Sequence, residues 1–259
     1  IPYIEEGIPV EKEYTIRNVD RTIPTKINYF ISLFYGDRGL PEDTIKLTFR
    51  GTAGQSFGAF NHKGVSITLI GDANDYVGKG MYGGRIVIIP EGVKETDKNV
   101  IMGNTCLYGA TGGELYAAGV AGERFAVRNS GAIAVIEGAG LHCCEYMTGG
   151  IVVVLGKVGF NLGAGMTGGH AYVLDDDLGK KLNYAYVYAR RLVGEEEIEE
   201  LRNLIEKHYE YTKSPKAKEI LENWDNYVKK FWKVIPLEQC ARDPYGDSDA
   251  CEVEFLGRK

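Results

Sequence analysis

Short apolar runs recur through the middle of the chain, each opened by a glycine and each apolar at alternate positions. Six such glycines follow one another at steps of 20, 29, 18, 19 and 19 residues: Gly64, Gly84, Gly113, Gly131, Gly150 and Gly169. The long step contains PEGVKETDKN, residues 90–99, whose charged and turn-forming residues predict a surface loop. Without the roughly ten residues of that loop, the series has one period of about nineteen residues.

Alternating β-branched and aromatic residues predict strands, and one strand per period predicts a repeat architecture. No helical pattern separates the runs, which argues against βαβ units, and no two-residue hairpin turns join them, which argues against a meander. We therefore predict an all-β core, a parallel β-helix of about six to seven coils stacked ~4.8 Å apart, between Ile45 and Leu174. The six glycines would form corners, where the chain turns sharply and often with positive φ.

The strands are apolar at both parities, which is typical of strands buried on both faces. Periodicity does not decide which parity faces inward. The outward residues must be covered by the tail of this chain or by a partner, and from them we predict a docking face. Its candidate residues are Ile86, Ile88, Ile133, Val135, Val152 and Val154.

The chain outside the repeat divides into two further segments. Residues 1–43 are predicted to form an N-terminal cap with a short helix within Ile23–Gly36, because open strand edges need cover. The β-helix would occupy residues 44–175. Residues 176–259 would form a two-helix tail, since Glu195–Tyr211 and Ala217–Ile235 carry apolar residues at helical spacing.

Composition narrows the class of protein and its partners. There are 34 glycines in 259 residues. The net charge of −6 argues against nucleic acid or an anionic membrane as a partner. No run approaches the ~18 apolar residues of a membrane span, and the N-terminal residues show no secretory signal. Five cysteines form no even framework, so we expect reduced thiols and a cytoplasmic location.

Candidate chemistry is sparse. Gly78-x-Gly80-x-x-Gly83 matches a dinucleotide fingerprint, and the pattern recurs at Gly163-x-Gly165-x-x-Gly168, but strands follow both where the fingerprint requires a helix. We interpret them as β-helix corners, with a backbone anion site as the alternative. Cysteine spacing suits no zinc site, and roles for Cys143, Cys240 and Cys251 do not emerge.

Polar residues form no convincing catalytic or metal-ligating set. Four histidines are scattered without a ligand pattern: His62, His142, His170 and His208. The clusters Asp72, Asn74, Asp75 and Glu123, Arg124, Arg128, Asn129 could serve acid–base chemistry or calcium binding, but turn hydrogen bonds and ion pairs are the simpler interpretation. We expect no catalytic residue, no metal and no cofactor in this chain.

Five longer segments resemble a known family. GTAGQSFGAF, GDANDYVGKGMYGGRIVI, NTCLYGATGGELYAAG, AGERFAVRNSGA and EYMTGGIVVVLG are similar to the C-terminal, GXGXG-type domain of the glutamate synthase large subunit. The likeness extends from NVDR to KVIP, about four-fifths of the chain. The resemblance implies a right-handed β-helix, in agreement with the repeat.

The resemblance also implies a role. Glutamate synthase converts glutamine and 2-oxoglutarate into two glutamates, using a glutamine amidotransferase part with an N-terminal cysteine and a part that holds FMN and an iron–sulfur cluster. The β-helix part of that family is a structural element. Since neither catalytic part accompanies it here, we expect a separately encoded, non-catalytic subunit of a split glutamate synthase. Its expected partners are the FMN-binding and amidotransferase subunits, or a second copy of this chain in isolation.

Two alternatives belong to other classes. A similar β-helix repeat occurs in a subunit of formylmethanofuran dehydrogenase, although the quoted segments match glutamate synthase better than glycine corners alone require. A self-contained β-helix enzyme such as a polysaccharide lyase would need clustered acids and a base on one coil face, and the sequence shows none.

Overall fold

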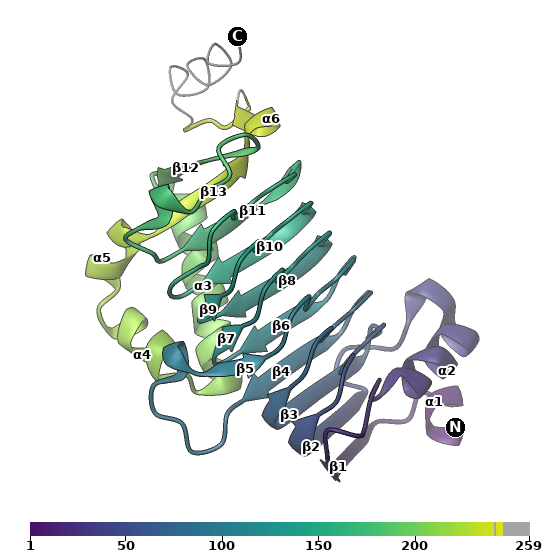
Figure 1. Ribbon diagram of the computed structural model, residues 1–259. Coiled ribbons are helices and arrows are strands. Elements are labelled where there is room, and N and C mark those ends of the chain that lie inside the picture. Colours follow the sequence, from purple (N-terminus) through teal and green to yellow (C-terminus); the bar gives the residue numbers. More distant parts are fainter. Residues whose placement is uncertain (241, 246–259) are drawn as a thin grey trace.

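The repeat folds into a parallel β-helix, which confirms the predicted fold class (Figure 1). The structure, a computed structural model, describes residues 1–240 and 242–245. One long face contains a strand from each coil: β2 (Ile45–Ala53), β3 (Val65–Ala73), β4 (Arg85–Ile89), β6 (Glu114–Ala117), β8 (Ser130–Ile136), β10 (Thr148–Val154) and β11 (Gly168–Val173). A shorter ladder forms a second face from β5 (Val100–Met102), β7 (Val120–Ala121) and β9 (Gly138–Ala139). The predicted loop at residues 90–99 contains only the 3₁₀ turn η2 (Thr96–Lys98).

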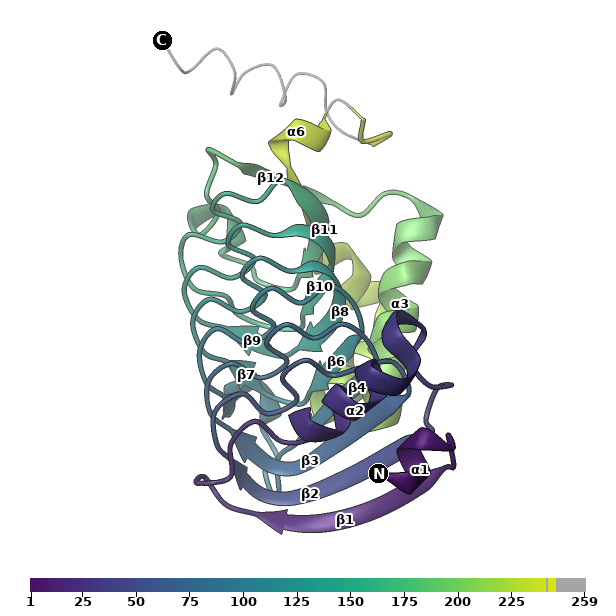
Figure 2. The same cartoon turned by 90° about the vertical axis from the view of Figure 1, so that its right-hand side faces the viewer.

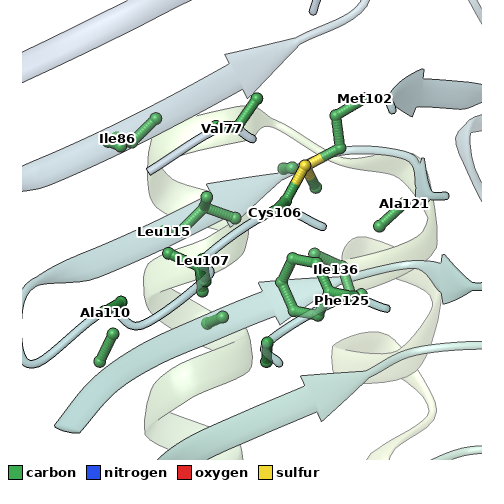
Figure 3. Packing of buried hydrophobic residues seen from close by; sticks show 14 of the residues in the cluster. Val77, Ile86, Met102, Cys106, Leu107, Ala110, Leu115, Ala121, Phe125 and Ile136 are labelled. Carbon is green, nitrogen blue, oxygen red and sulfur yellow. The ribbon is translucent and has the colours of Figure 1, made fainter. Parts of the chain in front are cut away.

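Register between coils places like residues in columns. One inward column, built by successive strand pairs, contains Leu47, Ile67, Ile86, Leu115, Ala134, Val152 and Ala171. These side chains are at most 4% exposed and form one continuous core with Ile88, Ile136 and Val154. Figure 3 shows this interior packed with aliphatic and aromatic carbon around Ile86, Leu115 and Phe125. The structure therefore shows which alternate residues of each strand face the interior.

The glycine alignment read from the sequence is one residue out in two coils. Gly84, Gly113, Gly150 and Gly169 each precede a member of the paired series Arg85, Glu114, Ile133, Ile151, His170 by one residue, but Gly131 precedes Ile133 by two. Gly64 likewise precedes Ser66, the partner of Arg85, by two residues. Gly131 is also the one member of the six without a positive φ. Its role is spatial, because a Cβ there would lie 2.3 Å from the Thr111 carbonyl oxygen.

The N-terminal segment contributes a strand as well as the predicted helix. β1 (Val10–Ile16) pairs in parallel with β2 and so extends the ladder before residue 44. The expected helix is α2 (Thr25–Tyr35), followed by η1 (Gly36–Arg38) and preceded by α1 (Pro2–Glu5). Figure 2 shows β1, β2 and β3 stacked at one end of the solenoid with α1 and α2 beside them. The helix flanks the first coils, and β1 forms the terminal rung.

The tail contains the first of the two predicted helices, but it differs from the prediction for the second. It comprises η3 (Leu178–Lys180), β12 (Val187–Arg191), α3 (Glu195–Thr212), α4 (Pro215–Glu222), α5 (Trp224–Tyr227), η4 (Val228–Lys230), β13 (Trp232–Pro236) and α6 (Leu237–Cys240). The predicted helix at 217–235 is therefore interrupted at Asn223, which leaves helical geometry with φ −120° and ψ 35°. Helical turns resume in α5 and η4 as far as Lys230, and only Trp232–Pro236 is a strand instead. β13 instead pairs antiparallel with β11 and β12. That pairing satisfies the open edge of the last coil, which a helix could not do.

Candidate functional site

A column of tight turns forms the third side of the solenoid. We call it the turn wall: residues 56–60, 76–80, 105–109, 124–128, 142–146 and 161–165. The first, third and fifth residues of every turn have positive φ, between 55° and 75°. Twelve of these eighteen are not glycine, among them Thr105, Leu107 and Tyr146. Left-handed backbone is rare for such residues, so each turn must be fixed by its surroundings.

Hydrogen bonds between coils fix it. In the second turn, the N–H groups of Tyr76 and Gly80 donate to the Asn104 and Tyr108 carbonyls of the next coil, at 2.9 and 2.8 Å. The Gly78 N–H donates in the opposite direction, to the Phe57 carbonyl at 2.8 Å. The first five turns repeat this pattern. Alternate residues thus bond up and down the stack, and the turns stack coil on coil like the strands (Figure 2).

The same hydrogen bonds bear on whether the two segments that match a dinucleotide fingerprint could bind a phosphate. A phosphate site needs unpaired N–H groups, usually at a helix start. The Gly78, Gly80 and Gly163 N–H groups all donate to carbonyls of neighbouring coils, and strands β4 and β11 follow the two segments. Both are β-helix corners, and neither fits a nucleotide or flavin phosphate.

The four histidines lie apart, each with its own neighbours. His142 lies 2.9 Å from Asn161 Nδ2, and His170 Nε2 lies 2.8 Å from Glu200 Oε2. His208 is fully buried, and His62 is buried beside Tyr82, with 4.8 Å between ring centroids. Burial lowers the pKa of His62. None forms a nucleophile–base pair or a ligand set.

The two polar clusters form hydrogen bonds and an ion pair in and beside the turns. Asp75 Oδ1 accepts a hydrogen bond from the Asn104 N–H at 2.7 Å, and Asp72 Oδ1 accepts one from Thr52 Oγ1 at 2.6 Å. Arg124 pairs with Glu145 at 2.8 Å, and Asn129 bonds the backbone of its own turn. The turn and ion-pair interpretation of these residues is therefore supported by their partners.

The cysteines of the solenoid are buried thiols. Cys106 lies among aliphatic and aromatic neighbours in Figure 3, and burial raises the pKa of its thiol to about 12. Cys143 and Cys144 are buried with 3.7 Å between their sulfur atoms, and the hydrogen bond from Cys143 and burial raise the pKa of Cys144. Cys240 is buried in α6. Cys251 lies outside the described residues.

The predicted docking face is not a surface. Ile86, Ile88, Val152 and Val154 point inward and belong to the solenoid core. Val135 faces outward but is fully buried, and Ile133 is partly buried beside it. The prediction combined two parities, because both are apolar and the glycine alignment in this coil was one residue out.

The outward face is covered by the tail of the chain itself. Tyr116, Val135, Val153 and Tyr172 form a second core with residues of α3 and α4, among them Leu201, Leu204, Ile205 and Ile220. Figure 1 shows α3 and α4 lying against this side of the sheet. The covering is therefore intramolecular, which was one of the two options left open by the sequence.

A buried polar cluster fastens the tail to the sheet. Glu137, His208 and Ser214 are each 0% exposed. Glu137 Oε1 accepts a hydrogen bond from Ser214 Oγ at 2.5 Å and lies 3.2 Å from His208 Nε2. Ser214 Oγ also accepts from the Ala217 N–H at 2.9 Å, which caps α4. The serine and histidine both face the carboxylate and have no solvent access, so the trio is a structural fastening.

A second ionic cluster lies at the C-terminal end. Arg190 contacts Glu197 at 2.8 Å and Asp243 at 2.7 Å. Burial alone would raise the pKa of Glu197, but hydrogen bonds from Arg190 and two backbone N–H groups outweigh it and lower the pKa to about 2. The Arg190 bond likewise overcomes burial to lower the pKa of Asp243 to about 2. This cluster ties β12 to the start of α3, and sequence spacing gave no indication of it.

Two of the open clefts on the surface lie beside the second face and the turn wall. One of about 590 Å³ lies beside the second face and is lined by four lysines: Lys98, Lys157, Lys216 and Lys230. Lys98 and Lys216 are already paired with acids. The other, of about 390 Å³, lies between α2 and the turn wall and is lined by Tyr29, Phe60 and Tyr82.

Over 1–240 and 242–245, no group of three or more His, Cys, Asp or Glu side chains could hold a metal ion. No helix in that part of the chain is both long and apolar enough to cross a bilayer.

Comparison with known proteins gives one family. The GXGXG motif family model matches residues 1–237. A ferredoxin-dependent glutamate synthase 2 from Synechocystis sp. is 55% identical over 100% of this chain, which spans 17% of that relative. The glutamate synthase [NADPH] large chain of Bacillus subtilis is 52% identical over 91% of this chain and 16% of its own length. The glutamate synthase [NADH] of Schizosaccharomyces pombe is 51% identical over 91% of this chain and 11% of its own length.

Proposed function

The chain belongs to the GXGXG motif family, in the form found in glutamate synthase large chains, and from this premise we propose that it is a non-catalytic structural subunit of a glutamate synthase. It would hold the FMN-binding and glutamine amidotransferase subunits in place while they form glutamate from glutamine and 2-oxoglutarate. Flavin and iron–sulfur cluster would both reside in the partner. The observation that carries the proposal is the 55% identity over the whole chain to a segment of such an enzyme.

The named relatives support a role that does not depend on the electron donor. Their names specify ferredoxin, NADPH and NADH, yet their identities to this chain are 55%, 52% and 51%. A segment that bound the donor would be expected to diverge with it. A scaffold that positions the common chemistry would not.

The side-chain chemistry supports the same role. The N–H groups of the glycine turns donate hydrogen bonds to carbonyls of neighbouring coils. The thiols of the solenoid are buried, and the Glu137 cluster has no access to solvent. These backbone groups, thiols and buried side chains are therefore used to build the solenoid. The formylmethanofuran dehydrogenase alternative has no support from the named relatives.

Isolation of the native assembly tests the proposal. The chain is purified from its source under non-denaturing conditions, and the associated polypeptides or covalently continuous domains are identified by mass spectrometry. We expect amidotransferase and FMN-binding sequences, glutamine-dependent glutamate formation by the assembly, and neither flavin absorption nor glutaminase activity from the isolated chain. Molybdenum- or tungsten-enzyme polypeptides in their place, or stoichiometric flavin on the isolated chain, would refute it.

A further inference from the structure

The fifth residues of the turns form an exposed column on the turn wall. They are Phe60, Gly80, Gly109, Arg128, Tyr146 and Gly165. The N–H groups of Phe60, Gly80, Gly109 and Arg128 donate to the Lys79, Tyr108, Val127 and Glu145 carbonyls, each one coil further on. These bonds align the six positions. With coils ~4.8 Å apart, the rings of Phe60 and Tyr146 are separated by about 19 Å along the axis.

The two rings are exposed and yet fixed. Phe60 and Tyr146 are each 53% exposed. A Cβ at Gly80 would lie 2.6 Å from the Phe60 ring, and one at Gly165 would lie 2.4 Å from the Tyr146 ring. Each ring therefore lies on the bare backbone of the next coil. A ring fixed before binding loses little conformational freedom on binding, which favours its use as an interface anchor.

The column contains one cation, Arg128, and the nearby Lys63 and Lys79 add two more, while one acid, Asp37, lines the cleft beside Phe60. Arg128 lies between the two rings. Lys63 follows Phe60 by three residues, and the Lys79 carbonyl on the next coil accepts the Phe60 N–H at 2.8 Å. Within the described residues, none of these three has a carboxylate within 4.0 Å, although the chain has a net charge of −6. Aromatic residues and arginine at the centre of a patch are the composition of protein–protein hot spots.

We propose that this column, with the cleft between α2 and Phe60, is the surface on which the catalytic part of glutamate synthase docks, through an acidic and apolar patch of that partner. The inference rests on the proposed function. The outward sheet face is closed by α3 and α4, and the last rung is closed by β13, so neither is available. In the relatives the matching segment is 11–17% of the chain, so a much larger catalytic part must meet its surface.

Hydroxyl-radical footprinting tests the surface in the native assembly. Oxidation rates of Phe60 and Tyr146 are compared between the native assembly and the isolated chain. We expect protection of about fivefold or more for both rings in the assembly, since anchors of an interface are desolvated. Val100, 64% exposed on β5 of the second face, is the control and should keep its rate.

Variants then separate docking from folding. Arg128→Glu, Phe60→Ser and Tyr146→Ser should each weaken retention of the catalytic part by about tenfold or more, with unchanged denaturation midpoints. Val100→Ser removes a side chain that is 64% exposed on β5 and should change nothing.

Each possible result either supports the docking surface or overturns it. Unprotected rings in an assembly that does contain catalytic glutamate synthase sequences would overturn the docking surface and leave the proposed function standing. An assembly without such sequences would overturn both. If sedimentation shows that the isolated chain dimerises and the variants abolish dimerisation, the occupant is a second copy and the proposal is wrong.

Discussion

Three Gly→Ala substitutions separate the two reasons for which this solenoid uses glycine. Gly109 has φ +62° and open space around its missing Cβ. Gly131 has no positive φ, but its Cβ would lie 2.3 Å from the Thr111 oxygen. Gly150 combines both conditions, with φ +85° and a Cβ position 2.3 Å from the Ala132 oxygen. The variants therefore test backbone conformation alone, crowding alone, and their sum.

The magnitudes follow from these geometries. A left-handed conformation costs alanine about 1–2 kcal/mol, and the narrower unfolded ensemble returns about 0.4–1 kcal/mol, so Gly109→Ala should lose about 1 kcal/mol. A Cβ so close to a backbone oxygen forces the coils to shift, and overpacking of this kind costs about 1–3 kcal/mol. After the same unfolded-state gain is subtracted, Gly131→Ala should lose about 1–2 kcal/mol. Gly150→Ala should lose about 3 kcal/mol, because both costs apply there.

Guanidinium unfolding followed by far-ultraviolet circular dichroism provides the free energies at one reference denaturant concentration. The expected order of destabilisation is Gly109→Ala, then Gly131→Ala, then Gly150→Ala. A Gly131→Ala variant as stable as the parent would show that the coils are not as closely stacked there as described. If Gly109→Ala were the most destabilised, conformation would dominate over crowding and the reasoning would fail.

Three further outcomes are expected. Thr105→Gly should gain about 1 kcal/mol and melt at higher temperature, because a β-branched residue is strained at φ +59°. Ser214→Ala should lose about 2–3 kcal/mol in urea unfolding, since it removes the α4 cap and leaves Glu137 short of a buried donor. Because the pKa of Glu197 is about 2 when folded and ordinary when unfolded, its contribution is complete above about pH 5 and lost as pH falls toward 2. Arg190→Gln should flatten that acid limb in unfolding free energies measured from pH 7 to 3, and an unchanged limb would contradict this assignment.

The repeat was readable from the sequence because stacking forces like residues onto like residues. Apolar alternation and recurring glycines were enough to predict parallel coils from Ile45 to Leu174. The register was not fully readable. Gly131 and its neighbour Ala132 are both small, and either could align with Gly113 and Gly150 until the strand pairs are known.

The tail and the site show why local patterns were insufficient. Residues Trp232–Pro236 continue a helix-compatible apolar pattern, but the unpaired edge of β11 is a tertiary demand that overrides it. The docking residues failed for a related reason, since parity is a property of the folded coil. Nothing in the sequence marked the turn wall as a surface, because its positive-φ positions include Tyr146, Arg128 and Thr105 as well as glycine.

The outward-facing residues of the sheet are apolar where the tail covers them and polar where it does not. Over the last five strands the outward column contains Val87, Tyr116, Val135, Val153 and Tyr172, whereas the first two strands place Thr48 and Thr68 there. Helix α3 contacts β4, β6 and β8, so the change to polar residues coincides with the end of its cover. A face that served a separate partner would need no such match to the length of its own helix. The sheet face is therefore covered within the chain, and the strained turns on the third side hold exposed rings at a spacing fixed by the coils. Backbone strain more often accompanies ligand sites. Here hydrogen bonds in both directions along the stack offset it, and what the strain maintains is a rigid surface.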